Sequence, residues 1–262
     1  MNMGIIAASR LRKNIAFDFS EATPSDEIVE LNTRYSESLW FKNDGLKMYT
    51  NPSYQWSLSE SWDLSTLSAV GLAGSSLASS GISTSNDGIY FYSCGGGTVR
   101  QHTLSNPWDL TSATLTNEIN LTSVGISRMR GLQISPDGTT LIIASDTNNK
   151  DINQITLSTA FDLSTYSSLI SIRALFVTVV HDMHVSPDGK FLFILDDGEV
   201  QSRFLHCFKL NTGWDISSLD SLLYKLNLDG RRVNSLYVRE DGRKFWISDI
   251  NFSPARLVEY SN

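Results

Sequence analysis

The side chains of this sequence that could do chemistry are concentrated in five short segments, each directly before an apolar run. The segments carry different residues at equivalent places: Glu37-Ser38, Ser80-Gly81, Arg130-Gly131, His181-Asp182 and Asn234-Ser235. Guanidinium groups present paired N–H donors that match carboxylate, phosphate and sulfate, and aromatic faces stack on sugar rings. Side chains of this kind suit a pocket for an anionic or polar ligand.

Further cationic and aromatic residues lie near these five segments in the sequence. The preceding loops contribute the arginines Arg34, Arg128, Arg231 and Arg232. A ligand site would place Arg130, His181 and Asp182 closest to the ligand, with Glu37, Asn234, Arg128, Arg231, Arg232, Tyr35, Trp40 and Tyr237 around them. The alternative is that the arginines are solvated loop residues paired with Glu37, Asp182 or Asp229.

Motifs for catalysis and for metal binding are scarce. His181 and His184 are three residues apart, a spacing that puts them on opposite faces of a strand and disfavours a shared metal. The acidic run Asp196-Asp197-Gly198-Glu199 lacks the alternating order of a calcium loop. Glu37 and Asp182 are the only candidates for a glycosidase-like pair of acids at one level of the fold. We therefore expect a protein without catalytic activity, metal or cofactor.

Two repeated signatures indicate the framework that must position these segments. An Asp-Gly pair followed by a short apolar strand occurs five times, at Asp44, Asp87, Asp137, Asp188 and Asp241. Between successive pairs lies an element of aromatic residue, aspartate and apolar residue, beginning at Trp62, Trp108, Phe161 and Trp214. The fifth copy of this element, Phe17-Asp18-Phe19, is near the N-terminus. The repeat is therefore circularly permuted.

Each repeat reads as four strands. In the third repeat they are expected at residues 131–135, 140–144, 152–157 and 169–175, with Asp137-Gly138 as a hairpin turn. Four antiparallel strands per repeat of roughly 40–50 residues predict an all-β, five-bladed β-propeller over residues 15–262. The segment from Ile15 to about Leu31 is expected to add the outer strand to the C-terminal blade, which closes the ring and removes a sheet edge.

The repeated residues are expected to be structural. The aspartate after each aromatic residue should accept hydrogen bonds from amides or hydroxyls of its turn, while the aromatic ring fills space between blades. Alternating apolar residues of the first strands, such as Leu132 and Ile134, should form the core between blades. Cys94 and Cys207 fall on different blades, so we expect no disulfide between them.

Charge separates the first 14 residues from the rest of the chain. The 28 acidic and 21 basic residues give a net charge of −7, which argues against broad nucleic-acid binding. Residues 1–14 contain Arg10, Arg12 and Lys13 and no acid. Their apolar stretch is too short for a secretory signal, and no apolar run reaches the ~20 residues of a membrane span. We expect an N-terminal arm over residues 1–14, either a frayed terminus or a segment that docks onto an acidic neighbour.

The turns Ser135-Pro136-Asp137-Gly138 and Ser186-Pro187-Asp188-Gly189 resemble those of surface-layer repeat and lactonase-like propellers. Lactonase-like proteins typically have seven blades, so this resemblance supports the fold and not their activity. A protein with five blades is similar to tachylectin-type sugar-binding propellers and to arabinanase-type glycosidases, although neither family's binding or catalytic motif is matched here.

A second resemblance concerns the layout of the whole chain. The arm Met3-Gly4-Ile5-Ile6-Ala7-Ala8-Ser9, followed by repeats rich in Ser, Thr and Asn, is similar to structural proteins of tailed bacteriophages, particularly tail or fibre components. This resemblance implies a virion location, an arm that binds other virion proteins, and a propeller that faces host-surface glycans. The alternative is a free extracellular lectin or a glycan-active hydrolase on the same fold.

Overall fold

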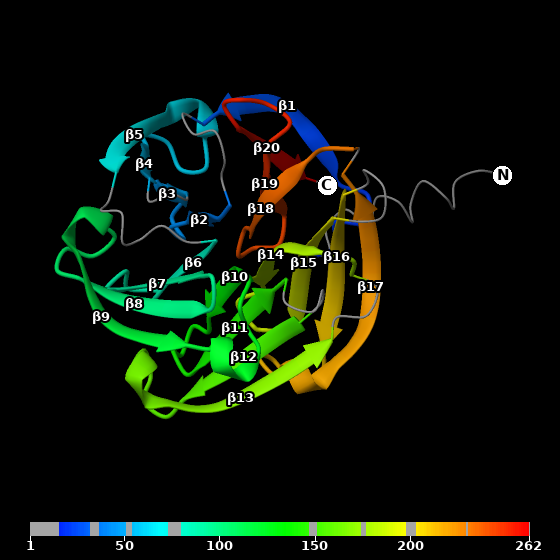
Figure 1. The fold of residues 1–262 in the computed structure, drawn as a ribbon. Coiled ribbons are helices and arrows are strands. Elements are labelled where there is room, and N and C mark those ends of the chain that lie inside the picture. Colours follow the sequence, from blue (N-terminus) through cyan, green and yellow to red (C-terminus); the bar gives the residue numbers. More distant parts are fainter. Residues whose placement is uncertain are drawn as a thin grey trace.

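The structure, a computed structural model, describes residues 16–31, 37–50, 54–72, 80–146, 151–173, 177–197, 203–228 and 230–261. These residues form five four-stranded antiparallel sheets that surround a central axis like blades (Figure 1). The all-β, five-bladed propeller predicted from the repeats is confirmed. The described helices are single turns, and none is long or apolar enough to cross a membrane.

Within blades 1 to 4 the strands follow one another in sequence order, and the first strand lies nearest the axis (Figure 1). Blade 1 consists of β2 (Leu39–Phe41), β3 (Lys47–Thr50), β4 (Tyr54–Leu58) and β5 (Leu67–Leu72). Blade 2 consists of β6 (Gly81–Thr84), β7 (Tyr90–Gly95), β8 (Thr98–Leu104) and β9 (Ala113–Asn120). Blade 3 consists of β10 (Met129–Ile134), β11 (Thr140–Ser145), β12 (Asp151–Leu157) and β13 (Tyr166–Arg173). Blade 4 consists of β14 (Val180–Val185), β15 (Phe191–Asp197), β16 (Arg203–Leu210) and β17 (Leu219–Asn227).

Blade 5 joins the two ends of the chain. Its inner strands are β18 (Val233–Val238), β19 (Lys244–Asp249) and β20 (Arg256–Ser261), and its outer strand is β1 (Thr23–Glu30). The antiparallel register places Thr23 opposite Ser261 and Glu30 opposite Arg256. The predicted closure by the N-terminal segment is therefore confirmed. The expected arm, residues 1–14 with Arg10, Arg12 and Lys13, lies outside the described residues.

The two repeated signatures meet in every blade. Each aromatic residue has a positive φ, between 59° and 66°, and covers the glycine of the Asp-Gly turn in its own blade. The aspartate that follows caps a single 3-10 turn: η1 (Leu64–Thr66), η3 (Leu110–Ser112), η6 (Leu163–Thr165) or η7 (Ile216–Ser218). In η6, Asp162 Oδ1 accepts hydrogen bonds from the Ser164 amide at 3.0 Å and the Ser164 hydroxyl at 2.6 Å. The structural role predicted for these aspartates is confirmed.

The core lies between blades, as the alternation of apolar residues predicted. Leu132 and Ile134 of β10 are buried, and so are the corresponding residues of the other first strands. The aromatic residues of the repeat also contact the neighbouring blade: the Trp62 ring of blade 1 stacks on Trp246 of blade 5, with centroids 5.2 Å apart. Cys94 and Cys207 are buried free thiols, in agreement with the expectation of no disulfide.

Glutamines on the third strands tie neighbouring blades together, a role that the sequence did not suggest. Gln55 of β4 accepts a hydrogen bond from the Leu110 amide at 2.9 Å, and Gln101 of β8 accepts one from the Leu163 amide at 2.8 Å. Each bond satisfies an N–H of the capped turn in the next blade, which would otherwise be buried without a partner.

Candidate functional site

The first strands bring two different rings of residues to the axis, one at each end. The residues at the starts of the first strands, or just before them, form what we call the arginine mouth: Glu37, Ser80, Arg130, His181 and Asn234. The residues just before the Asp-Gly turns, Asn43, Asn86, Pro136, Pro187 and Glu240, form what we call the turn mouth. Six residues of extended chain separate the two, on the order of 20 Å.

Adjacent blades do bring residues of the arginine mouth together. The Ser80 hydroxyl of blade 2 donates a hydrogen bond to Glu37 of blade 1 at 3.2 Å. His181 of blade 4 interacts electrostatically with Arg203 of the same blade and with Arg130 of blade 3. Burial, reinforced by these two cations, lowers the pKa of His181 to about 4, so its imidazole is neutral at physiological pH.

The arginines of this mouth are held by carboxylates other than those expected. Arg128 and Arg130 both contact Asp146 Oδ2, at 2.9 and 3.5 Å, and Arg231 contacts Asp249 Oδ2 at 3.3 Å. Asp146 and Asp249 are buried at the ends of the second strands of blades 3 and 5. Two guanidinium groups thus contact Asp146, and the Arg128 side chain is 63% exposed, so a guanidinium group of this mouth faces solvent.

Asp182 is engaged inside the fold instead of facing a ligand. Its side chain is buried, Oδ1 accepts the Met183 N–H at 2.8 Å, and Oδ2 accepts the Leu236 N–H of blade 5 at 2.9 Å. Burial raises its pKa well above the ordinary value. On the other side, a Cβ on Gly131 would lie only 2.6 Å from Asp182 Oδ1. Asp182 is therefore an inter-blade contact, and the expected position beside a ligand, or as one of an acid pair with Glu37, is corrected.

The other expected site residues divide into three groups. Asn234 is half-buried and Arg232 is exposed at the arginine mouth. Tyr35 and Arg34 lie outside the described residues, as does Asp229. Trp40 and Tyr237 do not flank the arginines but line a cavity at the turn mouth. This is a correction with a simple cause, because their positions in the strand fall beyond the arginine mouth, on the side of the Asp-Gly turns.

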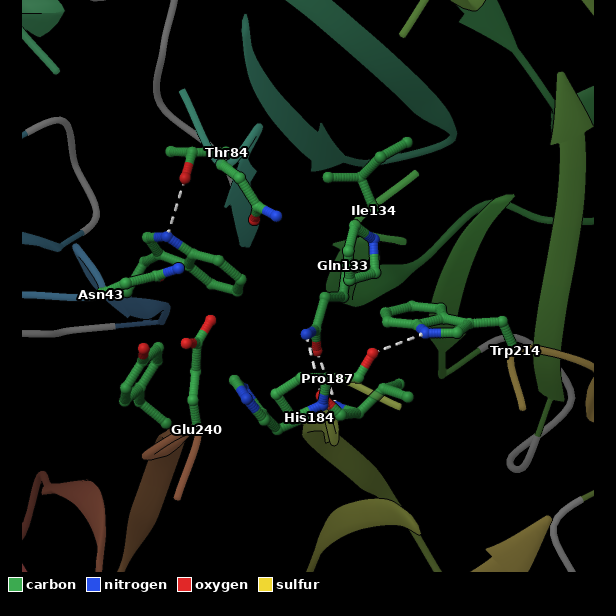
Figure 2. Close-up of a pocket in the computed structure, with 13 residues that line it drawn as sticks. Asn43, Thr84, Gln133, Ile134, His184, Pro187, Trp214 and Glu240 are labelled. Atoms are coloured by element: carbon green, nitrogen blue, oxygen red, sulfur yellow. Dashed lines mark hydrogen bonds between the residues drawn. The ribbon is translucent and has the colours of Figure 1, made fainter. Parts of the chain in front are cut away.

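The cavity at the turn mouth is built by all five blades and has a volume of about 30 Å³. Space of this size holds one or two groups as large as a water molecule. Trp40, His184 and Tyr237 form its inner wall, while Asn43, Asn86 and Glu240 lie at its rim. Figure 2 shows the Glu240 carboxylate and the His184 imidazole directed into the same space.

Hydrogen bonds fix most of the cavity wall. The Trp40 indole N–H donates to Thr84 Oγ1 at 3.0 Å, and the Trp214 indole N–H donates to the Pro187 carbonyl at 3.2 Å (Figure 2). The Gln133 amide exchanges two hydrogen bonds with the Val185 backbone, at 2.9 and 2.6 Å. The polar ends of these three side chains are thus already satisfied.

His184 is held in the cavity by aromatic contacts. Its ring lies edge-on to Tyr237, with centroids 4.9 Å apart, and 5.8 Å from the Trp40 ring. Burial lowers the pKa of His184 to about 3, so the imidazole is neutral and offers one nitrogen as an acceptor. Within the described part of the chain, no group of three or more metal-ligating side chains occurs.

The sequence contained a signal for this cavity in the register of the repeats. The residue four positions before the aspartate of each Asp-Gly pair is Trp40, Ser83, Gln133, His184 or Tyr237. These residues differ as widely as those of the arginine mouth. Comparison of only the residues before the strands misses this second variable ring.

Comparison with known proteins supports the fold. No protein-family profile matches the sequence, and no curated protein matches it. Among solved structures, the β-propeller domain of Cps50 (Swd1) from Myceliophteria thermophila is similar, with a TM-score of 0.53 and 12% sequence identity. The match covers 92% of this chain and 100% of that chain. At this identity the likeness concerns the propeller architecture alone.

Proposed function

We propose that this protein is a non-enzymatic binding module of a tailed-bacteriophage virion, in its tail or fibre. The observation that carries the proposal is the contrast between scaffold and axis. The turns, caps and core repeat in every blade, while the residues of the arginine mouth and the ring of Trp40, Ser83, Gln133, His184 and Tyr237 differ from blade to blade. A rigid ring that presents unlike side chains at its ends is suited to binding. The N-terminal sequence and the hydroxyl-rich repeats support the virion assignment.

In this proposal residues 1–14 attach the propeller to other virion proteins. Their positive charge would favour an acidic neighbour. Among the described residues, which start at residue 16, the closing segment makes a backbone contact at Phe17, whose N–H donates to the Gly242 carbonyl at 2.8 Å. Attachment and folding are thus assigned to different parts of the N-terminal region.

Two truncations test the attachment. Removal of residues 1–14 should abolish incorporation into phage particles while circular dichroism and the melting temperature stay unchanged. Removal of residues 1–31 should also unfold blade 5, because β1 and the buried Phe19 are lost. A protein lacking residues 1–14 that is folded and still enters particles would overturn the attachment role.

Glycan binding at the arginine mouth is a second candidate function. It is favoured by the exposed Arg128 guanidinium, which lies beside Arg130 on Asp146 and can offer N–H donors to an anionic sugar. The test is an array of neutral, sulfated and phosphorylated glycans at two salt concentrations. Binding should weaken with salt and with Arg128→Ala. The matched control is Arg243→Ala, which removes an exposed arginine next to the Asp-Gly turn of blade 5, at the opposite end of the axis from the arginine mouth.

The same array distinguishes a binding module from a glycan-active hydrolase. If the protein only binds, bound glycans should remain intact after long incubation with the wild type. If the wild type releases sugar and Glu37→Gln does not, the protein is a hydrolase. If no glycan binds at either salt concentration, the receptor-binding hypothesis is wrong and only the structural role in the virion is still proposed.

A further inference from the structure

The cavity at the turn mouth contains polar side chains that are not used by the fold. Within the described residues, no hydrogen bond or ion pair engages the side chains of Glu240, His184, Asn43 or Asn86. A Glu240 carboxylate only accepts hydrogen bonds, neutral His184 has one acceptor nitrogen and one N–H, and each amide has a carbonyl oxygen and an NH2 group. The Trp40 indole N–H is already used. Glu240 and the acceptor nitrogen of His184 can therefore receive a donor from a ligand.

Among the described residues, Glu240 is the only charged side chain that lines this cavity. Its carboxylate is directed over the cavity (Figure 2), and desolvation raises its pKa above the ordinary value. A positive group placed beside it would restore the favourable interaction that desolvation removes. An anionic ligand would be repelled, so this end of the axis has the opposite preference from the arginine mouth.

Size and wall chemistry narrow the cation further. A cavity of about 30 Å³ accepts a group of water-like size, such as a primary ammonium. An ammonium group has three N–H donors and no acceptor, which matches the Glu240 carboxylate and the acceptor nitrogen of His184. The Trp40 ring, which lines the same space, attracts a cation.

We propose that this cavity binds the primary ammonium group of a lysine side chain presented by a partner protein. The ammonium of this lysine would donate to Glu240 and to the acceptor nitrogen of His184. This site is independent of the arginine mouth and of the attachment by residues 1–14.

The test uses small probes and the full-length protein. n-Butylammonium and Nα-acetyl-lysine methylamide are titrated in, and binding is followed by NMR shifts of the His184 imidazole and the Trp40 indole. Both probes should cause saturable shifts at these two rings. n-Butanol and Nε-acetylated lysine should not, because they lack the positive charge.

Glu240→Gln should raise the dissociation constant for n-butylammonium at least tenfold. Glu240 is exposed, so this variant should keep the wild-type melting temperature. The matched control is Glu118→Gln, which removes an exposed carboxylate from the outer strand β9 and should leave the affinity unchanged.

Three results would overturn the proposal. These are no shift at His184 and Trp40 with n-butylammonium, equal affinity in Glu240→Gln, and equal or tighter binding of glucosamine through Glu240. The last would assign the site to an amino sugar and so to a glycan. None of these results bears on incorporation into particles, so the proposed virion role is tested separately.

Discussion

Trp62 lies directly over Gly45: its ring atoms are 2.5 Å from the position that a Cβ on this glycine would occupy. The Trp62 N–H donates to the Gly45 carbonyl at 3.1 Å. The corresponding backbone bond occurs in all five blades. The Asp-Gly turn and the aromatic-Asp element are therefore two halves of one structural unit that links the inner hairpin of a blade to its outer loop.

We expect Gly45→Ala to destabilise the protein more than an alanine at a comparable open glycine. Gly45 and Gly96 both have positive φ, 70° and 59°, but no atom lies within 4 Å of a Cβ at Gly96. Both substitutions carry the backbone penalty of about 1–2 kcal/mol. Gly45→Ala should cost about 1–3 kcal/mol more, because it also displaces Trp62. Equal free energies of unfolding in denaturant titrations would contradict this.

Asp162→Ala should lower the free energy of unfolding by about 1 kcal/mol through loss of the cap on η6. Asp220→Ala removes an exposed aspartate from β17 without removing a cap and should change stability by less than about 0.5 kcal/mol. Thermal melts of the two variants give the comparison. Similar losses in both would show that net charge, and not capping, is responsible.

The stability contributed by the Asp-Gly turns should decrease at low pH. Burial alone would raise the pKa of Asp137, but hydrogen bonds from the Ser135 hydroxyl and from Thr139 outweigh it and hold the pKa below its ordinary value. A carboxyl group with a lowered folded-state pKa stabilises the fold above its unfolded-state pKa of about 4, and this contribution is lost as pH falls through the folded-state value.

Asp137→Asn tests this dependence because the variant cannot ionise. The wild type should exceed it in melting temperature at pH 7, and the difference should shrink as pH falls below about 4. A difference that stays constant down to pH 3 would assign the contribution of Asp137 to geometry instead of charge.

Asp182→Asn should destabilise the propeller by about 1–3 kcal/mol, because the new amide nitrogen faces a backbone N–H of Met183 or Leu236. Asn234→Ala, at the same mouth on the next blade, removes a half-buried amide and should cost less than about 1 kcal/mol. Chemical denaturation measures both. If Asp182→Asn were neutral in stability, the inter-blade role assigned to this carboxylate would be wrong.

The repeats made the fold predictable because each carries its own local physics. Positive φ at Gly138, the capping oxygen of Asp162 and the alternation of Leu132 and Ile134 are properties of short segments, and five copies reinforce one another. The circular shift of Phe17-Asp18-Phe19 was sufficient to predict which strand closes the ring.

The candidate sites were harder to predict because they depend on contacts between residues of different strands. Asp146 binds Arg128 and Arg130 only because the end of β11 returns beside the start of β10. Trp40 and Tyr237 are close in sequence to the arginine mouth, yet three residues of strand carry them toward the opposite end. Spacing along one repeat does not contain this information.

The pairing of β1 with β20 also determines how the ring responds to mechanical load. Thr23 faces Ser261, so the chain leaves both strands at the same end of the pair. A force that pulls the two chain ends apart opens the hydrogen bonds one after another, from Thr23 toward Glu30, as in unzipping. The ladder therefore resists little force in this direction, and blade 5 would peel open while the other four blades keep their strands.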